Sequence, residues 1–173
     1  LGGLVKLGYG FAYRVLDAQF FGVAQRRRRV FVVGCLGDAA SAAAVLFERH
    51  SLQRNPAPSR EKGKNVAGTI AIAFGWQNSS SRGNSVSENV TPTLDKSKTP
   101  AVAIGNVVRR FTPVECERLQ GFQDNFTRIP WRNKSADDCP DGSRYKALGN
   151  SMAVPVMHWI GKRIDEVEKI NGQ

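Results

Sequence analysis

The sequence is poor in cysteine and contains no long apolar run. Its three cysteines, Cys35, Cys116 and Cys139, are odd in number and widely spaced, which argues against a disulfide framework and against a Cys-x-x-Cys metal site. No apolar run approaches the roughly 20 residues of a membrane-spanning helix, and the opening residues show no cationic and then apolar signal segment. We therefore expect a reducing, cytoplasmic compartment, no membrane contact and no bound metal.

Acidic residues are also scarce. Against 25 Lys and Arg there are only 15 Asp and Glu, so the formal net charge is +10 and the isoelectric point is near 10.0. A domain this basic suggests a polyanionic partner. Residues 26–29 are all arginine and directly precede an apolar run at 30–33. Like charges at the start of a core strand repel one another unless an anion or polar ligand binds there. We therefore expect these arginines to bind nucleic acid.

Both ends of the chain carry regular patterns, and 173 residues with 41% hydrophobic content are enough for one ordinary core and a smaller satellite. The run at 30–33 is continuously apolar, as in a strand covered on both faces. Thr112, Pro113 and Glu115 predict a helix start. In chain order the expected elements are a helix over 1–8, strands over 11–16 and 30–33, a helix over 39–49, a helix from 112 that stops at Gly121, a loop over 124–144 and an amphipathic helix over 154–168.

The middle of the chain has a different texture. Between 51 and 106 it is crowded with Ser, Asn, Gly, Pro, Lys and Arg, and only 69–74 and 101–104 look like strands. This region is either a disordered linker or a loop-dominated subdomain whose tips carry function. Its residue types suit a surface that recognises DNA, because cationic side chains bind phosphates while Asn, Gln and Arg form hydrogen bonds with base edges. Its clustered cations are Lys62, Lys64, Arg82, Lys96 and Lys98.

Three segments together resemble the C-terminal third of a DNA (cytosine-5)-methyltransferase. They are Gly22-Val-Ala-Gln25-x-Arg27-x-Arg29, then Arg110-Phe-Thr-Pro continuing to Arg118-Leu-Gln-Gly-Phe122, and finally Tyr145-Lys-Ala-Leu-Gly149-Asn150-Ser151. They occur in the family's order and flank a variable polar region where the family keeps its target-recognition domain. The resemblance covers essentially the whole chain.

The resemblance implies an α/β fold, namely a partial S-adenosylmethionine-dependent methyltransferase domain with a small irregular target-recognition subdomain. The partial domain would hold the distal sheet strands and the last helix. We expect residues 1–49 to be the distal part of the catalytic domain and residues 50–108 to be the recognition subdomain. Residues 109–173 would support that subdomain and return to the catalytic domain. The sheet edge is expected to pair with another copy or to be covered by a partner.

The resemblance also assigns roles to residues. Arg29 would hydrogen-bond O2 of a cytosine flipped out of the duplex, while Arg27 and Gln25 would hold that pocket and the adjacent backbone. Arg26 and Arg28 would point to solvent or phosphates, since alternate strand residues face opposite ways. Asn150 and Ser151 would line the S-adenosylmethionine pocket, or else form only the turn before the last helix. The remaining DNA-binding candidates are Thr93, Leu94, Arg82 and Lys96.

Two family elements are absent from the sequence: the Pro-Cys-Gln nucleophile and the Phe-x-Gly-x-Gly cofactor loop. Each cysteine is therefore expected to be a structural or idle thiol. The implied function is methyl transfer to C5 of cytosine in double-stranded DNA by base flipping, as in restriction-modification systems. We expect the chain to be a C-terminal fragment, inactive without an N-terminal methyltransferase half or self-association. The alternatives are a non-catalytic DNA-binding module or remnant, and a basic RNA-associated protein.

Overall fold

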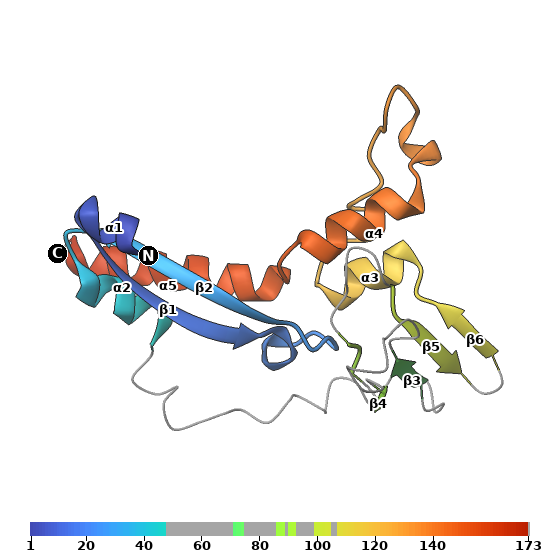
Figure 1. Cartoon of the computed structure of the whole chain (residues 1–173), viewed down its shortest axis with the longest axis horizontal. Coiled ribbons are helices and arrows are strands. Elements are labelled where there is room, and N and C mark those ends of the chain that lie inside the picture. Colours follow the sequence, from blue (N-terminus) through green and yellow to red (C-terminus); the bar gives the residue numbers. More distant parts are fainter. Residues whose placement is uncertain (48–70, 75–85, 89, 93–98, 105–106, 173) are drawn as a thin grey trace.

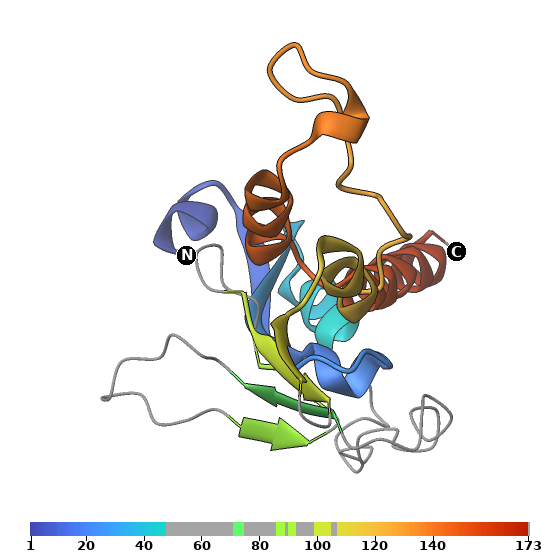
Figure 2. The same ribbon diagram turned by 90° about the vertical axis from the view of Figure 1, so that its right-hand side faces the viewer.

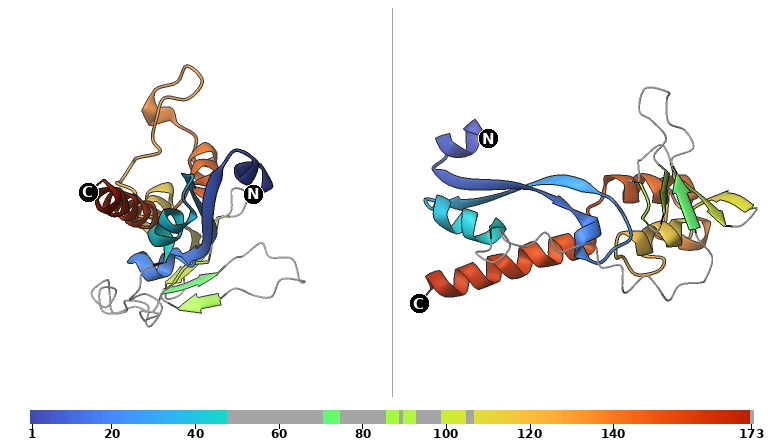
Figure 3. Two further views of the ribbon diagram at one scale, coloured as in Figure 1. Left: turned by 90° about the vertical axis from the view of Figure 1, so that its left-hand side faces the viewer. Right: turned by 90° about the horizontal axis from the view of Figure 1, so that it is seen from below.

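The computed structural model describes residues 1–47, 71–74, 86–88, 90–92, 99–104 and 107–172 (Figure 1). Within these residues the chain forms two lobes. The first lobe is a β-hairpin with the long C-terminal helix along it, and the second is a small sheet with two helices at the other end of the molecule (Figure 3). None of the described helices is long and apolar enough to cross a membrane.

The first lobe is built on the antiparallel strands β1 (Tyr9–Asp17) and β2 (Arg28–Leu36). Helix α1 (Gly2–Lys6) precedes β1, and the short 3-10 helix η1 (Ala18–Phe21) connects the strands. The Asp17 carboxylate caps η1 and also accepts the backbone N–H of Arg27 at 3.0 Å. One carboxylate therefore fixes both ends of the connection that carries the arginine run.

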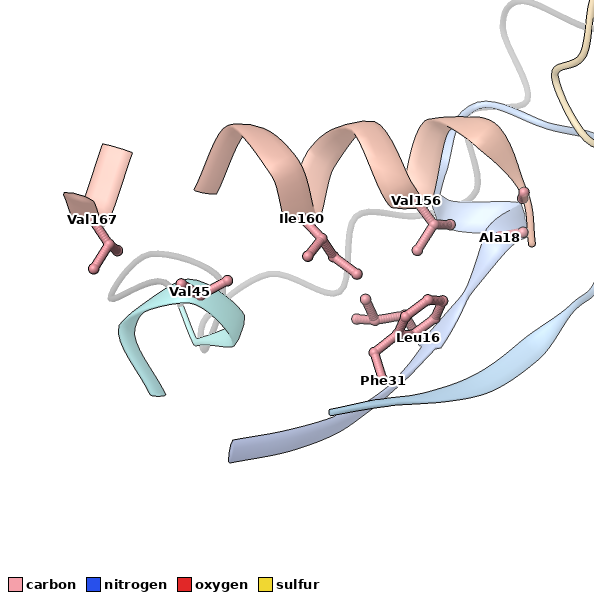
Figure 4. Packing of buried hydrophobic residues seen from close by; sticks show 8 residues of the cluster. Leu16, Ala18, Phe31, Val45, Val156, Ile160 and Val167 are labelled. Atoms are coloured by element: carbon pink, nitrogen blue, oxygen red, sulfur yellow. The ribbon is translucent and has the colours of Figure 1, made fainter. Parts of the chain in front are cut away.

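Helices α2 (Ala39–Leu46) and α5 (Val154–Asn171) pack with the hairpin around two adjoining hydrophobic clusters. Asp38 caps α2 by accepting from the N–H groups of Ala40 and Ser41. In Figure 4, Val156 and Ile160 of α5 face Leu16 and Phe31 of the hairpin. The predicted strands of this lobe and its amphipathic last helix are confirmed. The helix predicted over 39–49 is present but ends at Leu46, and residues 48–49 lie outside the described residues.

The opposite face of the hairpin carries exposed apolar side chains. Tyr13 is paired with Val32 and Val15 with Val30, and the exposed fractions are 58% for Tyr13 and 63% for Val30. The expectation that residues 30–33 are covered on both faces is therefore wrong for the described residues. Successive strand residues point to opposite faces, and α2 and α5 pack with the side chains of only one of them.

The second lobe contains a four-stranded antiparallel sheet in the order β4-β3-β5-β6. Its strands are β3 (Ala71–Phe74), β4 (Val86–Glu88), β5 (Ala101–Ile104) and β6 (Val107–Arg110). The two expected strands are present as β3 and β5, whereas β4 and β6 were not expected. All four residues of β6 are exposed, so this strand has no alternating burial pattern that a sequence could display.

Helices α3 (Pro113–Leu119) and α4 (Asp141–Asn150) pack together beside that sheet, around Cys116 and Leu148. The capping box predicted at Thr112 and Glu115 is present. The loop expected over 124–144 is wrong at its C-terminal end, because α4 begins at Asp141 and a 3-10 helix, η3 (Ala136–Asp138), lies before it. Pro140 ends the loop with extended backbone, and Asp141 supplies the acidic first turn that a helix N-terminus favours.

Candidate functional site

The arginine run lies at the start of β2, with one member buried and three exposed. Arg27 is 2% exposed, whereas Arg26, Arg28 and Arg29 are exposed. The backbone of Arg27 is fixed on both sides, by the Asp17 carboxylate and by a 3.0 Å hydrogen bond from the Ala18 N–H to the Arg27 carbonyl. Of the four arginines, Arg27 is therefore buried inside the molecule and the other three are exposed to solvent.

The buried guanidinium of Arg27 binds the bend between α4 and α5. Its Nη2 donates to the carbonyl oxygen of Gly149 at 2.8 Å and to the carbonyl oxygen of Ser151. Burial lowers the pKa of Arg27 to about 10, with a further contribution from the positive charge of Arg29. Arg27 is therefore still a cation at neutral pH, and its charge is directed at backbone carbonyl oxygens of the third motif.

The same bend is held from a second side by Gln120, which is fully buried. Gln120 Nε2 donates to the Leu148 carbonyl at 2.7 Å, and its Oε1 lies 2.6 Å from the Ser151 hydroxyl. The Val154 N–H, in the first turn of α5, donates to the Gln120 carbonyl at 2.9 Å. The three sequence motifs therefore meet at one point, where α4 ends and α5 begins.

Arg29 lies next to this junction. It pairs with Leu16 in the hairpin and so lies on the face that also carries Phe31. Its side chain is exposed, and its charge is close enough to lower the pKa of Arg27. Asn150, the last residue of α4, is exposed as well, while the hydroxyl of the following Ser151 lies within hydrogen-bond distance of Gln120 and Leu148. Arg27 thus binds the residues on both sides of Asn150 and feels the charge of Arg29.

Gln25 joins the arginine segment to the middle of the chain. Its backbone forms a parallel bridge with Thr91, and the Arg26 N–H donates to the Thr91 carbonyl at 2.9 Å. The Thr91 N–H and hydroxyl both donate to the Ala24 carbonyl. The Gln25 side chain is fully buried, and neither its amide nitrogen nor its oxygen has a hydrogen-bond partner among the described residues.

The other predicted DNA contacts lie outside the described residues. These are Arg82, Thr93, Leu94 and Lys96, together with Lys62, Lys64 and Lys98 of the same region. They remain predictions.

The cysteines lie where structural thiols are expected. Cys116 is fully buried between α3 and α4, and burial together with the neighbouring Glu115 and Glu117 raises the pKa of its thiol to about 12. A thiol with this pKa is protonated at neutral pH and is a poor nucleophile. Cys35 and Cys139 are partly buried. In the described part of the chain, His, Cys, Asp and Glu side chains form no cluster that could hold a metal ion.

The sequence did not predict a buried ion pair between α3 and α4. Glu117 is fully buried and accepts from Arg144 Nη2 at 3.1 Å, from the backbone N–H groups of Asn125 and Thr127, and from the Thr127 hydroxyl. Burial alone would raise the pKa of the carboxyl, but the bonds from Thr127, Arg144 and Asn125 outweigh it and lower the pKa. Nothing in the run Glu115-Cys116-Glu117 distinguishes the buried carboxylate from an exposed one.

Comparison with known proteins shows that a chain with this fold and these three motifs is a DNA methyltransferase by family. The family model described as "C-5 cytosine-specific DNA methylase" matches residues 2–75 and 48–166. The chain belongs to this family.

Similar curated proteins include the "DNA N-6-adenine-methyltransferase" of Escherichia phage P1, 30% identical over 270 residues, with 88% of this chain and 36% of that protein covered. The type II methyltransferase M2.BsuMI of Bacillus subtilis is 27% identical, with 94% of this chain and 42% of that protein covered. M.NlaX of Neisseria lactamica is 29% identical, with 95% and 55% covered. The chain therefore spans about a third to a half of the length of these relatives.

A solved structure supports the fold. The Entamoeba histolytica methyltransferase EhMeth aligns with a TM-score of 0.51 at 16% sequence identity, covering 94% of this chain and 55% of that one. The expected partial methyltransferase fold, with distal strands and the last helix, is confirmed.

Proposed function

We propose that this chain supplies the cytosine-pocket arginine and the recognition surface of an enzyme that methylates C5 of cytosine in double-stranded DNA. The observation that carries the proposal is the buried clamp from Arg27 to the carbonyls of Gly149 and Ser151. The clamp holds the two residues that flank the exposed Asn150, and the exposed Arg29 is close enough to Arg27 to lower its pKa. A group for the target base and a group for the methyl donor thereby come from one rigid junction.

Arg29 would act on the flipped cytosine. When a thiolate adds to C6 of the base, electron density moves onto the ring, and a fixed guanidinium at O2 stabilises that charge more strongly than it stabilises the ground state. Extruding the base costs a few kcal/mol of stacking and pairing, which polar contacts in the pocket must offset. Because Arg29 is held on a β-strand with its side chain exposed, it can meet an incoming base without rearrangement of the core.

The residues at the bend fit a role beside S-adenosylmethionine in one respect. Arg27 occupies the carbonyl oxygens of Gly149 and Ser151, and Gln120 engages the Ser151 hydroxyl, so the exposed side chain of Asn150 remains available to a ligand. Ser151 would then shape the bend and Asn150 would contact the donor. When bound, S-adenosylmethionine supplies the methyl group from its sulfonium centre.

We propose the domain division that the sequence suggests, with residues 1–49 and the last helix in the catalytic domain and residues 50–108 as the recognition subdomain. Residues 109–173 support the recognition subdomain and return to the catalytic domain, which the last helix joins. Two features support the division: α5 packs against the hairpin, and α3 and α4 pack together in the second lobe.

Methyl transfer also needs a nucleophilic cysteine and a cofactor loop, and this sequence contains neither Pro-Cys-Gln nor Phe-x-Gly-x-Gly. We propose that the methyltransferase portion bearing them covers the outer face of the hairpin. That face exposes the apolar side chains of Tyr13, Val15, Val30 and Val32, which form two cross-strand pairs. A contiguous apolar face of this kind indicates a surface that another protein segment buries.

The test is transfer of tritium from labelled S-adenosylmethionine to DNA. The chain alone should transfer nothing above background, and addition of the N-terminal half of a close family member should restore transfer. DNA binding without restored transfer would contradict the enzymatic proposal and favour a non-catalytic DNA-binding module. Catalysis by the chain alone would contradict the assignment of the nucleophile to the other portion.

A further inference from the structure

The segment between α3 and α4 extends away from both sheets and ends in a tight turn formed by Trp131, Arg132, Asn133 and Lys134 (Figure 2). The backbone groups of Trp131 and Lys134 exchange two hydrogen bonds, of 3.2 and 2.9 Å. Arg132 and Asn133 have φ angles of +45° and +65°, as a two-residue turn with both central residues left-handed requires. We call these four residues the tip turn.

The tip turn carries two positively charged side chains. Arg132 and Lys134 are exposed, and neither forms an ion pair with a carboxylate in the part of the chain that the structure describes. The acidic side chains of the surrounding segment are all engaged locally. Their partners are Arg118 for Asp124, Arg128 for Asp137, Ser135 for Asp138 and Arg144 for Asp141. None of these four carboxylates is paired with Arg132 or Lys134.

The tip turn also presents flat and apolar surface next to these cations. The Arg132 guanidinium lies over the Trp131 ring, 5.4 Å from its centroid, and the Trp131 residue is 36% exposed. Ile129 nearby in sequence is 57% exposed. A guanidinium held on an aromatic ring keeps its edge free to donate to an anion. Holding Arg132 in the left-handed region costs on the order of 1 kcal/mol, so this exposed geometry is not the one that the chain would adopt by default.

We propose that the tip turn is a second DNA-contacting element, which binds backbone phosphates through Arg132 and Lys134. The inference rests on the proposed function, from which it takes DNA as the ligand. Unpaired cations beside an exposed aromatic ring suit a phosphate backbone with its deoxyribose groups, whereas a protein-docking site would be expected to present a larger apolar patch. The turn extends away from the sheet of the second lobe (Figure 2), so the DNA phosphates that it binds would flank the recognition sequence. The contribution of the turn to DNA affinity would therefore not depend on base sequence.

The test compares DNA affinity at several salt concentrations for the full chain and for two double variants. Arg132→Ala with Lys134→Ala should reduce the magnitude of the slope of log affinity against log salt by about 1.8, at about 0.9 per lost phosphate contact. The loss should be equal for duplexes of unrelated sequence. The matched control, Lys162→Ala with Lys169→Ala, removes the same charge from exposed positions on α5 and should retain the wild-type slope.

Asn133→Gly keeps both cations and relieves the strain of a left-handed backbone position. This variant should bind DNA like the wild type. Such a result would show that strain in the turn does not determine DNA affinity. If the tip variant matches the α5 control, the inference is overturned while the proposed function stands; a tip that binds an acidic protein would give this result. If the wild-type chain binds no DNA, both proposals fail.

Discussion

The guanidinium of Arg27 donates to the carbonyl oxygen of Gly149, a residue 122 positions later in the chain, over 2.8 Å. This contact joins the start of β2 to the end of α4, and the neighbouring bond to Ser151 extends it into the bend before α5. Two of the three sequence motifs are thus in direct contact, and Gln120 brings in the third. Arg27, which the sequence predicts to hold the cytosine pocket and the adjacent backbone, is buried and braces the bend between α4 and α5.

The first prediction concerns this brace. Arg27→Met removes the donor and leaves the carbonyls of Gly149 and Ser151 buried without it, at about 1–3 kcal/mol for each unsatisfied group. We therefore expect the free energy of unfolding in urea to fall by about 2–5 kcal/mol. Arg26→Met, at the adjacent exposed position, is the control and should stay within about 0.5 kcal/mol of the wild type. Equal effects of the two variants would show that the brace is not energetically important.

The second prediction concerns the buried pair of Glu117 and Arg144. Glu117→Gln leaves the buried Arg144 with only the exposed Asp141 carboxylate, at 3.9 Å, and breaking a buried pair costs about 3–5 kcal/mol. Since the folded-state pKa of Glu117 is lowered, its contribution is fully present above the unfolded pKa of about 4.3 and is lost as pH falls below it. The wild type should therefore lose stability below about pH 4.3 more steeply than Glu117→Gln, as urea titrations at several pH values would show. Parallel pH profiles would contradict this assignment.

The third prediction concerns thiol reactivity. Cys116 is fully buried with a pKa raised to about 12, so in the native chain it should resist iodoacetamide at pH 8. Cys35 and Cys139 are only partly buried and should be alkylated first. Peptide mass spectrometry with and without urea checks this order. Alkylation of Cys116 before the other two would mean that α3 and α4 do not pack as described.

How much the sequence predicts depends on whether a residue acts locally. The Thr112 and Glu115 capping box and the apolar spacing of Val156 and Ile160 are local signals, and both were confirmed. Strand β6 was missed because Val107 and Val108 are both exposed, so neither face is marked. The burial of Glu117 and Gln120 depends on partners in α4 and the loop before it, which no pattern within α3 encodes.

The fourth prediction concerns the outer face of the hairpin. Val32 is 45% exposed, so Val32→Glu should change the stability of the isolated chain by no more than about 0.5 kcal/mol. It should nevertheless prevent restoration of methyl transfer by the N-terminal half, because it would bury an unpaired carboxylate in the contact. Ile170→Glu, on α5 at 73% exposure, is the control and should leave restoration intact. Full restoration with Val32→Glu would place the contact on another surface.

The central claim is that Arg29 acts on the target cytosine, and its neighbour Arg28 offers a matched control, since the two lie on opposite faces of the same strand. The decisive measurement is the methyl-transfer rate constant of the restored enzyme at saturating DNA and S-adenosylmethionine. Loss of one donor to a developing charge costs about 10²–10³-fold, so Arg29→Ala should slow transfer by at least 100-fold. With the N-terminal half also saturating, Arg28→Ala should leave the rate constant within about two-fold of the wild type, because Arg28 lies on the outer face of the hairpin and would not contact the base. Equal rates for the two variants would contradict the account.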